Sequence, residues 1–143
     1  MKVQQLSVFL ENKPGQLKRA CDLLTKANIN ILTLSLADTK QFGILRLIIG
    51  EWERAKSVLA EDGYVVKTTE VLALEVADRP GGLNEVLAHV DASGLNVEYM
   101  YAFAYGREGK AVMIFRFDDA DKALDSLKAA GVNVIGGVEL YSR

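Results

Sequence analysis

The residues best suited to hold a small ligand form a Pro-Gly turn that occurs twice in the chain. The two copies are Glu11-Asn12-Lys13-Pro14-Gly15-Gln16-Leu17 and Ala77-Asp78-Arg79-Pro80-Gly81-Gly82-Leu83, 66 positions apart. Each is followed by a helical pattern, and the N–H groups that open a helix carry a partial positive charge that can hold an anionic group. Gly15 and Gly81 allow a ligand to approach the main chain closely.

A second pair of polar residues repeats at the same interval. Asn30 and Asn96 are also 66 positions apart, and they directly precede Ile31 and Val97. A carboxamide is both a donor and an acceptor, so an asparagine can contact a ligand group of either charge. The plainer alternatives are that Asn12 caps a helix and that Asn30 and Asn96 are turn residues, because asparagine often fills both roles.

The segments around these residues have the periodicities of a mixed fold. Polar and apolar residues alternate over residues 6–11, which predicts a strand with one buried face. Leu17, Ala20, Cys21 and Leu24 then recur at helical spacing, which predicts a helix whose apolar stripe includes Cys21 as a core residue. Further strands are expected at 29–38, 42–50, 64–70, 71–77, 95–105, 111–118 and 132–141, and further helices from 52, at 81–93 and at 119–130.

The order strand, helix, strand, strand, helix, strand therefore occurs twice. This order is that of the ferredoxin-like fold, in which four antiparallel strands carry both helices on one face. We expect an α+β protein with two such βαββαβ modules at 1–70 and 71–143. Modules of this size bury only a modest core alone, so an interface between modules is expected.

Composition excludes several classes of protein. The chain has 143 residues, 50% of them hydrophobic and 25% charged, with a net charge of -2 and no basic cluster. Nucleic acid is not an expected partner, because binding to phosphates needs concentrated Lys and Arg. No apolar run approaches about 18 residues, so we expect no membrane association and a cytoplasmic location.

No catalytic or metal-binding pattern is present in the sequence. His89 is the only histidine, and it has no cysteine or histidine partner at metal-binding spacing, so we expect a surface residue. Asp118, Asp119 and Asp121 are acidic, but a position at the start of a helix explains them. We therefore expect no catalytic residue, no metal and no cofactor.

The Pro-Gly turn, the helix behind it and a strand opening at Asn-Ile or Asn-Val together resemble the ACT domain, a ferredoxin-like module that senses amino acids. The resemblance covers nearly the whole chain as two copies. It implies that a free amino acid binds between two modules, held by the turn of one and the start of the second strand of its neighbour. The residues so implicated are Asn12, Lys13, Pro14, Gly15, Gln16, Leu17, Asn30 and Ile31, with Asp78, Gly81, Gly82, Leu83, Asn96 and Val97 in the second copy.

The two turns are not equivalent for such a ligand. A zwitterion needs donors for its carboxylate and acceptors for its ammonium, and Asn12 offers both. The second turn departs from the family pattern with Asp78, which only accepts when ionised and repels a carboxylate. We therefore expect the first turn to be the better binding site.

The resemblance implies a non-catalytic regulatory protein whose output acts on an enzyme in trans or through oligomerisation. One alternative is a small acylphosphatase-like hydrolase, which would need an arginine in a phosphate-binding turn and an asparagine that orients water. The turns offer Lys13 and Arg79 without an evident completed site. A purely structural interaction module is a further alternative.

Four aromatic residues alternate along the second strand of the second half. Tyr99, Tyr101, Phe103 and Tyr105 share one predicted sheet face, as in an RNA-stacking platform. The acidic pI of about 5.5 and the absence of flanking basic clusters disfavour RNA. We expect this face to pack on another sheet, either within the chain or in a homodimer.

Overall fold

The computed structural model describes residues 1–38, 40–103 and 106–142. Its contacts divide the chain into two compact units. Gln4–Thr69 form the N-terminal unit, and Met1–Val3 together with the chain from Glu70 onward form the C-terminal unit. The predicted modules at 1–70 and 71–143 remain our proposed domain limits.

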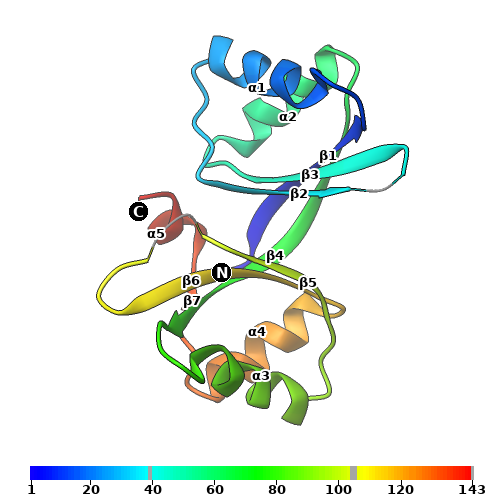
Figure 1. The fold of residues 1–143 in the computed structure, drawn as a ribbon. Coiled ribbons are helices and arrows are strands. Elements are labelled where there is room, and N and C mark those ends of the chain that lie inside the picture. The colour runs from blue at the N-terminus through cyan, green and yellow to red at the C-terminus, as the bar shows by residue number, and fades with distance from the viewer. Residues whose placement is uncertain (39, 104–105, 143) are drawn as a thin grey trace. The chain divides into compact units, whose positions relative to one another are not determined.

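The N-terminal unit is a four-stranded antiparallel arrangement with two helices. Its strand order is β2-β3-β1-β4, and Figure 1 shows α1 and α2 on one side of these strands. The elements are β1 (Val3–Glu11), α1 (Gln16–Lys26), β2 (Thr33–Asp38), β3 (Phe42–Ile48), α2 (Trp52–Glu61) and the beginning of β4 (Val65–Ala77).

Alternation along β1 and β3 builds the core of this unit. The side chains directed at the helices are buried, and they pack on small and branched residues of α1 and α2. The core residues are Leu6, Val8, Leu10, Ala20, Leu24, Ile29, Leu45, Leu47, Ile49, Ala55 and Leu59. Two residues of the apolar stripe predicted for α1 are not core residues. Leu17 is 39% exposed and Cys21 is only partly buried.

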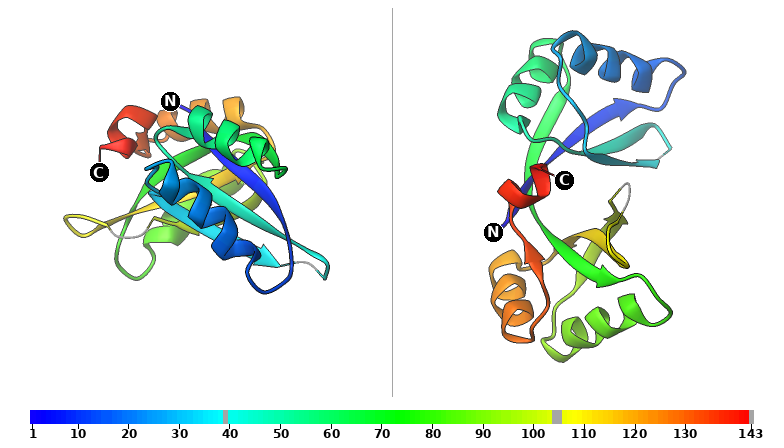
Figure 2. Two further views of the ribbon diagram at one scale, coloured as in Figure 1. Left: turned by 90° about the horizontal axis from the view of Figure 1, so that it is seen from above. Right: turned by 90° about the vertical axis from the view of Figure 1, so that its left-hand side faces the viewer.

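The C-terminal unit repeats the arrangement. Its strands follow the order β7-β4-β6-β5, and Figure 2 shows α3 and α4 on one side of β4, β5 and β6. The elements after β4 are α3 (Gly82–Ala92), β5 (Val97–Ala102), β6 (Lys110–Phe117), α4 (Ala120–Ala129), β7 (Val134–Ile135) and α5 (Gly137–Tyr141). The predicted α+β class with two ferredoxin-like modules is confirmed.

Several predicted element limits were wrong. The strands expected at 64–70 and 71–77 are one continuous strand of 13 residues, β4. The strand expected at 132–141 is only two residues long, because Gly136 and Gly137 interrupt it and α5 follows. The second strands begin later than expected, at Thr33 and Val97, and β5 ends at Ala102.

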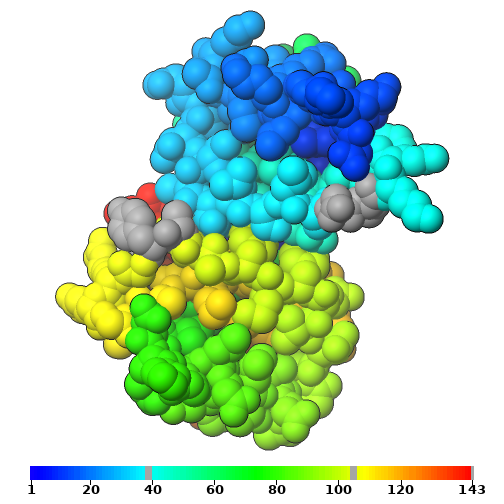
Figure 3. Space-filling view, viewed as in Figure 1, coloured from blue at the N-terminus to red at the C-terminus, as the bar shows by residue number. Residues whose placement is uncertain are grey.

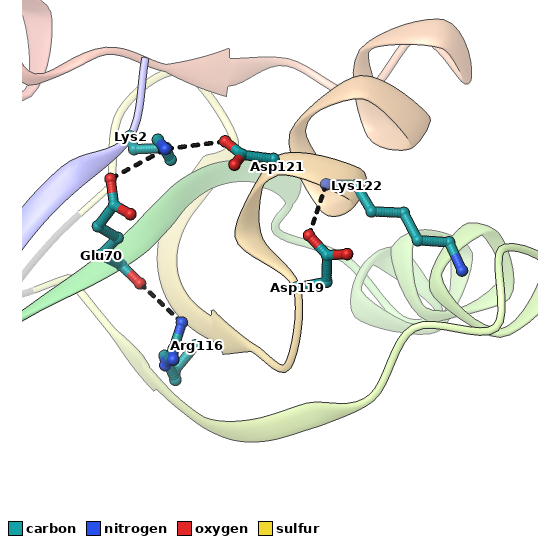
Figure 4. Close-up of polar contacts among 6 residues, drawn as sticks. All are labelled: Lys2, Glu70, Arg116, Asp119, Asp121 and Lys122. Atoms are coloured by element: carbon teal, nitrogen blue, oxygen red, sulfur yellow. Dashed lines mark hydrogen bonds and ion pairs between the residues drawn. The ribbon is translucent and has the colours of Figure 1, made fainter.

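The first three residues are held to the C-terminal unit by polar contacts (Figure 4). Lys2 Nζ lies 2.8 Å from Asp121 Oδ1 and 3.0 Å from Glu70 Oε2. Hydrogen bonds to Asp121 and then to Glu70 raise the pKa of Lys2, so its ammonium is charged throughout the neutral range. Arg116 donates to the main-chain oxygen of Glu70 at 3.3 Å, which fixes the same part of β4.

Gly82, the first residue of α3, is required by a close backbone contact. A β-carbon there would lie 1.9 Å from the carbonyl oxygen of Ala77. We expect Gly82→Ala to lower the free energy of unfolding by about 1–3 kcal/mol, because the start of α3 must move away from β4. Urea unfolding measures this change.

Gly136→Ala is the matched control, because a β-carbon at Gly136 meets nothing closer than Met1 Cγ at 4.0 Å. Its unfolding free energy should equal or slightly exceed that of the parent protein. Equal stability of the two variants would contradict the proposed contact.

Candidate functional site

The first Pro-Gly turn forms one wall of a small pocket in the N-terminal unit. The pocket has a volume of about 80 Å³ and is bounded by the end of β1, the start of α1, β2 and β3. Its lining residues are Leu10, Glu11, Asn12, Lys13, Gln16, Leu17, Leu36 and Gly43. The structure therefore brings together four of the residues singled out in the sequence: Asn12, Lys13, Gln16 and Leu17.

The turn leaves the start of α1 open. Pro14 is exposed, and Gly15 is the N-cap residue with a φ of 87°, a conformation that strongly favours glycine. The N-cap residue of α1 is therefore Gly15 and not Asn12, and Gly15 has no side chain that could cap the helix. The Gln16 amide donates to the Lys13 carbonyl at 3.3 Å, which leaves the next amides of the first turn without a partner inside the helix.

The other long helices have acidic side chains at or near their N-termini, where these side chains interact favourably with the helix dipole. The first turn of α1 has none. Asp119 caps α4 by accepting a hydrogen bond from the Lys122 amide at 3.0 Å (Figure 4). The first turns of α2 and α3 contain Glu53 and Glu85. Of the helices in the described part of the chain, α1 has neither a capping side chain nor an acidic first turn. Its N-terminus is thus the one most suited to an external carboxylate.

The basic residues of both turns are engaged by glutamates. Lys13 Nζ lies 2.8 Å from Glu11 Oε2, and this hydrogen bond raises the pKa of Lys13. Arg79 lies 2.7 Å from Glu85. Both cations are therefore already paired, which does not favour a phosphate-binding turn of the acylphosphatase kind.

Asn30 and Ile31 lie at the opposite end of α1 from the pocket. The helix has 11 residues, which at about 1.5 Å per residue separates its ends by about 16 Å. Asn30 is exposed in the loop before β2, whereas Ile31 packs partly against the core. A pocket built from one unit therefore contains Asn12 but not Asn30.

The second turn has a similar main chain and different surroundings. The Asp78 amide donates to Gly109 at 2.9 Å, as the Asn12 amide donates to Gln41. Gly81 has the same left-handed conformation as Gly15. Gly82, however, is buried against β4, and Leu83 packs on the core of the C-terminal unit. Gly82 is the counterpart of Gln16, and its main chain is in close contact with β4.

Asn96 and Val97 are fixed by a contact that the first unit lacks. The Asn96 amide donates to Asp118 Oδ1 at 3.0 Å, and the Asp118 amide donates to the Asn96 carbonyl at 3.2 Å. Gly50 holds the corresponding place before α2 and has no side chain to do this. Val97 packs partly on the core.

Four lining residues were not among the predicted site residues: Glu11, which adjoins them in the turn, and Leu10, Leu36 and Gly43. Leu10, Leu36 and Gly43 come from three different strands. The alternation of polar and apolar residues predicts which face of the sheet a residue occupies, but not which residues of other strands lie next to it. A β-carbon on Gly43 would lie 3.4 Å from Leu36 Cδ1, so the Leu36 side chain lies over this glycine. No local signal reveals such a contact, because it depends on the pairing of β2 with β3.

The remaining candidates do not line the pocket of the first turn. His89 is exposed on α3, and within residues 1–38, 40–103 and 106–142 no group of three acidic, histidine or cysteine side chains is placed to hold a metal ion. Over the same ranges no helix is long and apolar enough to cross a bilayer. Tyr99 and Tyr101 are half-buried, and Tyr105 lies outside the described residues.

Comparison with known proteins agrees with this architecture. A family model described as an ACT domain pair matches residues 1–141. Protein BT0572 from Bacteroides thetaiotaomicron is 34% identical, with a TM-score of 0.93 over 100% of this chain and 98% of that one. Among curated proteins, none matches the sequence.

More distant structures share the fold. The ligand-free regulatory subunit of aspartate kinase from Thermus thermophilus is 16% identical, with a TM-score of 0.62 over 89% of this chain and 91% of that one. The corresponding subunit from Thermus flavus is 15% identical, with a TM-score of 0.58 over 90% and 92% of the two chains.

Asp118 should stabilise the start of β5. Its Oδ1 accepts from the amides of Asn96 and Asp119, so Asp118→Ala removes two hydrogen bonds. We expect a loss of about 1 kcal/mol in unfolding free energy, measured by urea titration. Asp121→Ala, in the first turn of α4, should cost less because its carboxylate is 79% exposed and its contact with Lys2 is a surface ion pair. Equal losses of unfolding free energy in the two variants would contradict a stabilising role of the Asp118 hydrogen bonds.

Proposed function

The chain belongs to the ACT domain pair family, and we propose that it binds a free amino acid and regulates a partner protein without catalysing a reaction. The single observation that carries this proposal is the small pocket at the start of α1, a helix whose N-cap residue is a glycine and whose first turn contains no acidic residue. Main-chain N–H groups and a helix dipole are suited to the carboxylate of an amino acid.

The pocket of one unit supplies only part of such a site. Asn12 and Gln16 can contact the head group from the pocket wall, and both carry donors and acceptors. Asn30, the other residue that the family resemblance assigns to the ligand, lies beyond the far end of α1, a helix about 16 Å long. We propose that the Asn30 that completes the site belongs to a neighbouring module.

An exposed edge strand offers a way to bring that neighbour in. β2 is the outermost strand of its sheet, and its hairpin with β3, coloured cyan, lies at the surface in Figure 3. Leu34 and Leu36 are 46% and 53% exposed, although they stand opposite the buried residues Leu47 and Leu45 in the register with β3. An apolar edge of this kind favours pairing with another strand.

Antiparallel pairing of β2 with β2 of a second copy would complete the site. In such a pair the start of one strand lies beside the end of the other. Asn30 stands three residues before the start of β2, and Leu36 and Gly43 of the pocket stand near its end. A homodimer formed in this way would therefore carry two equivalent sites, each with a turn from one copy and Asn30 from its partner.

We propose that occupancy is transmitted to an enzyme in trans in the cytoplasm. A ligand that bridges two modules stabilises one arrangement of them over another by its difference in affinity. Two proteins of similar fold are regulatory subunits of aspartate kinase, which supports a role of this kind. The second turn, with Asp78 and the buried Gly82, is proposed as the weaker site.

A screen of the standard amino acids by thermal shift tests the proposal. One amino acid should stabilise the protein, by about 2.7 kcal/mol at 100 times its Kd. Asn12→Ala and Asn30→Ala should each lower its affinity about tenfold or more, because a hydrogen bond to a charged group is lost. Both variants should unfold at the temperature of the unliganded parent protein, since both residues are exposed.

Asn84→Ala is the control, because Asn84 is exposed on α3 and lies outside the pocket. It should keep the full response. If none of the standard amino acids stabilises the protein, the proposed function fails. If both pocket variants respond like the parent protein, the site lies elsewhere.

The proposed dimer predicts a separate result. Leu34→Glu places a charge on the apolar edge of β2 and should shift the protein toward monomer in light scattering at micromolar concentration. Val138→Glu is the control, since Val138 is 89% exposed and belongs to α5 of the C-terminal unit rather than to β2. A parent protein that is monomeric, or equal masses for both variants, would contradict pairing through β2.

A further inference from the structure

We propose that the amino acid bound at the first turn has a small aliphatic side chain, such as that of valine or leucine. The proposal rests on the amino-acid site proposed above and adds the class of ligand. Its basis is the chemistry of the pocket walls, to which Leu10, Leu17 and Leu36 contribute three leucine side chains.

Two of these leucines are exposed within the single chain. Leu10 is buried at 3% exposure and forms the floor, whereas Leu17 and Leu36 are 39% and 53% exposed. They come from α1 and β2, and both line the same pocket. An apolar ligand side chain placed between them would remove apolar surface from water on both walls.

The charged groups of the pocket do not favour a charged ligand side chain. Glu11 and Lys13 are the two ionised residues of the lining, and they pair with each other at 2.8 Å. A lysine or aspartate side chain would need one of them as a partner and would have to break this pair. The amide groups of Asn12 and Gln16 are better matched to the ligand's head group.

The size of the pocket limits the ligand further. Its volume of about 80 Å³ is well below the roughly 150 Å³ of a cavity that binds benzene. Leu36 Cδ1 lies near Gly43, where a β-carbon would approach it to 3.4 Å, so the side chain is packed in place over that glycine. The pocket thus suits a few methyl-sized groups and disfavours an aromatic ring.

Isothermal titration of the full-length protein with valine, leucine, alanine, threonine, lysine and phenylalanine tests the inference. Each additional buried methylene should raise affinity about fourfold, so valine or leucine should bind at least tenfold tighter than alanine. Threonine, which has the shape of valine with a hydroxyl, should bind roughly 10–100-fold more weakly than valine. Lysine and phenylalanine should bind more weakly than either aliphatic ligand.

Leu36→Phe fills the pocket and should lower aliphatic affinity at least tenfold. Leu34→Phe is the matched control, because Leu34 is exposed on the same face of β2 but does not line the pocket. Light scattering on both variants shows whether they keep the oligomeric state of the parent protein. If Leu36→Phe binds valine and leucine as tightly as the parent protein does, Leu36 does not contact the ligand side chain and the proposed aliphatic pocket is wrong.

The outcomes separate this inference from the function on which it rests. Tightest binding by threonine, lysine or phenylalanine would overturn the aliphatic class and leave the amino-acid site standing. Absence of binding by every amino acid would overturn the site and, with it, the inference.

Discussion

Strand β4 is the constraint on which both halves of the molecule depend. It runs for 13 residues, and its beginning completes the sheet of the N-terminal unit while its end pairs with β6 and β7 in the C-terminal unit. Besides β4, the N-terminal unit contains β1, β2 and β3, and the C-terminal unit contains β5, β6 and the two-residue β7. A ferredoxin-like sheet without this strand would expose an unpaired edge and part of its core. The duplication is therefore joined by shared secondary structure rather than by a linker.

The start of α1 shows a conflict between stability and binding. A side-chain cap or an acidic residue in the first turn typically adds about 1 kcal/mol or less, and α4 uses both through Asp119 and Asp121. α1 has a glycine at its N-cap and no acidic residue in its first turn. Local rules of helix stability are often broken where a ligand supplies the missing partner. This is the physical reason for assigning the proposed amino-acid site to the first turn.

The two copies of the turn have diverged in their surroundings rather than in their main chain. Gly15 and Gly81 share a left-handed conformation, and the residues before them make the same backbone hydrogen bonds. Gly82 brings the start of α3 against β4, beside a pocket that Glu85 and His89 also line, whereas Gln16 lines the smaller pocket at the start of α1. Asp118 fixes Asn96, and Gly50 leaves Asn30 without that contact. Duplication thus conserved the scaffold while the side chains around each turn came to differ.

The sequence by itself determined the repeated turns, the helices, the fold class and half of the pocket. These depend on Gly and Pro conformations and on periodicity, which act over a few residues and can be read locally. Only the tertiary structure decided that two predicted strands are one, that 137–141 is a helix, and that Leu17 and Leu36 meet at one pocket. It also decided that Asn12 and Asn30 lie at opposite ends of α1. Those outcomes depend on which distant strands and helices become neighbours, and hydrophobic pattern specifies the buried face of an element but not its neighbour.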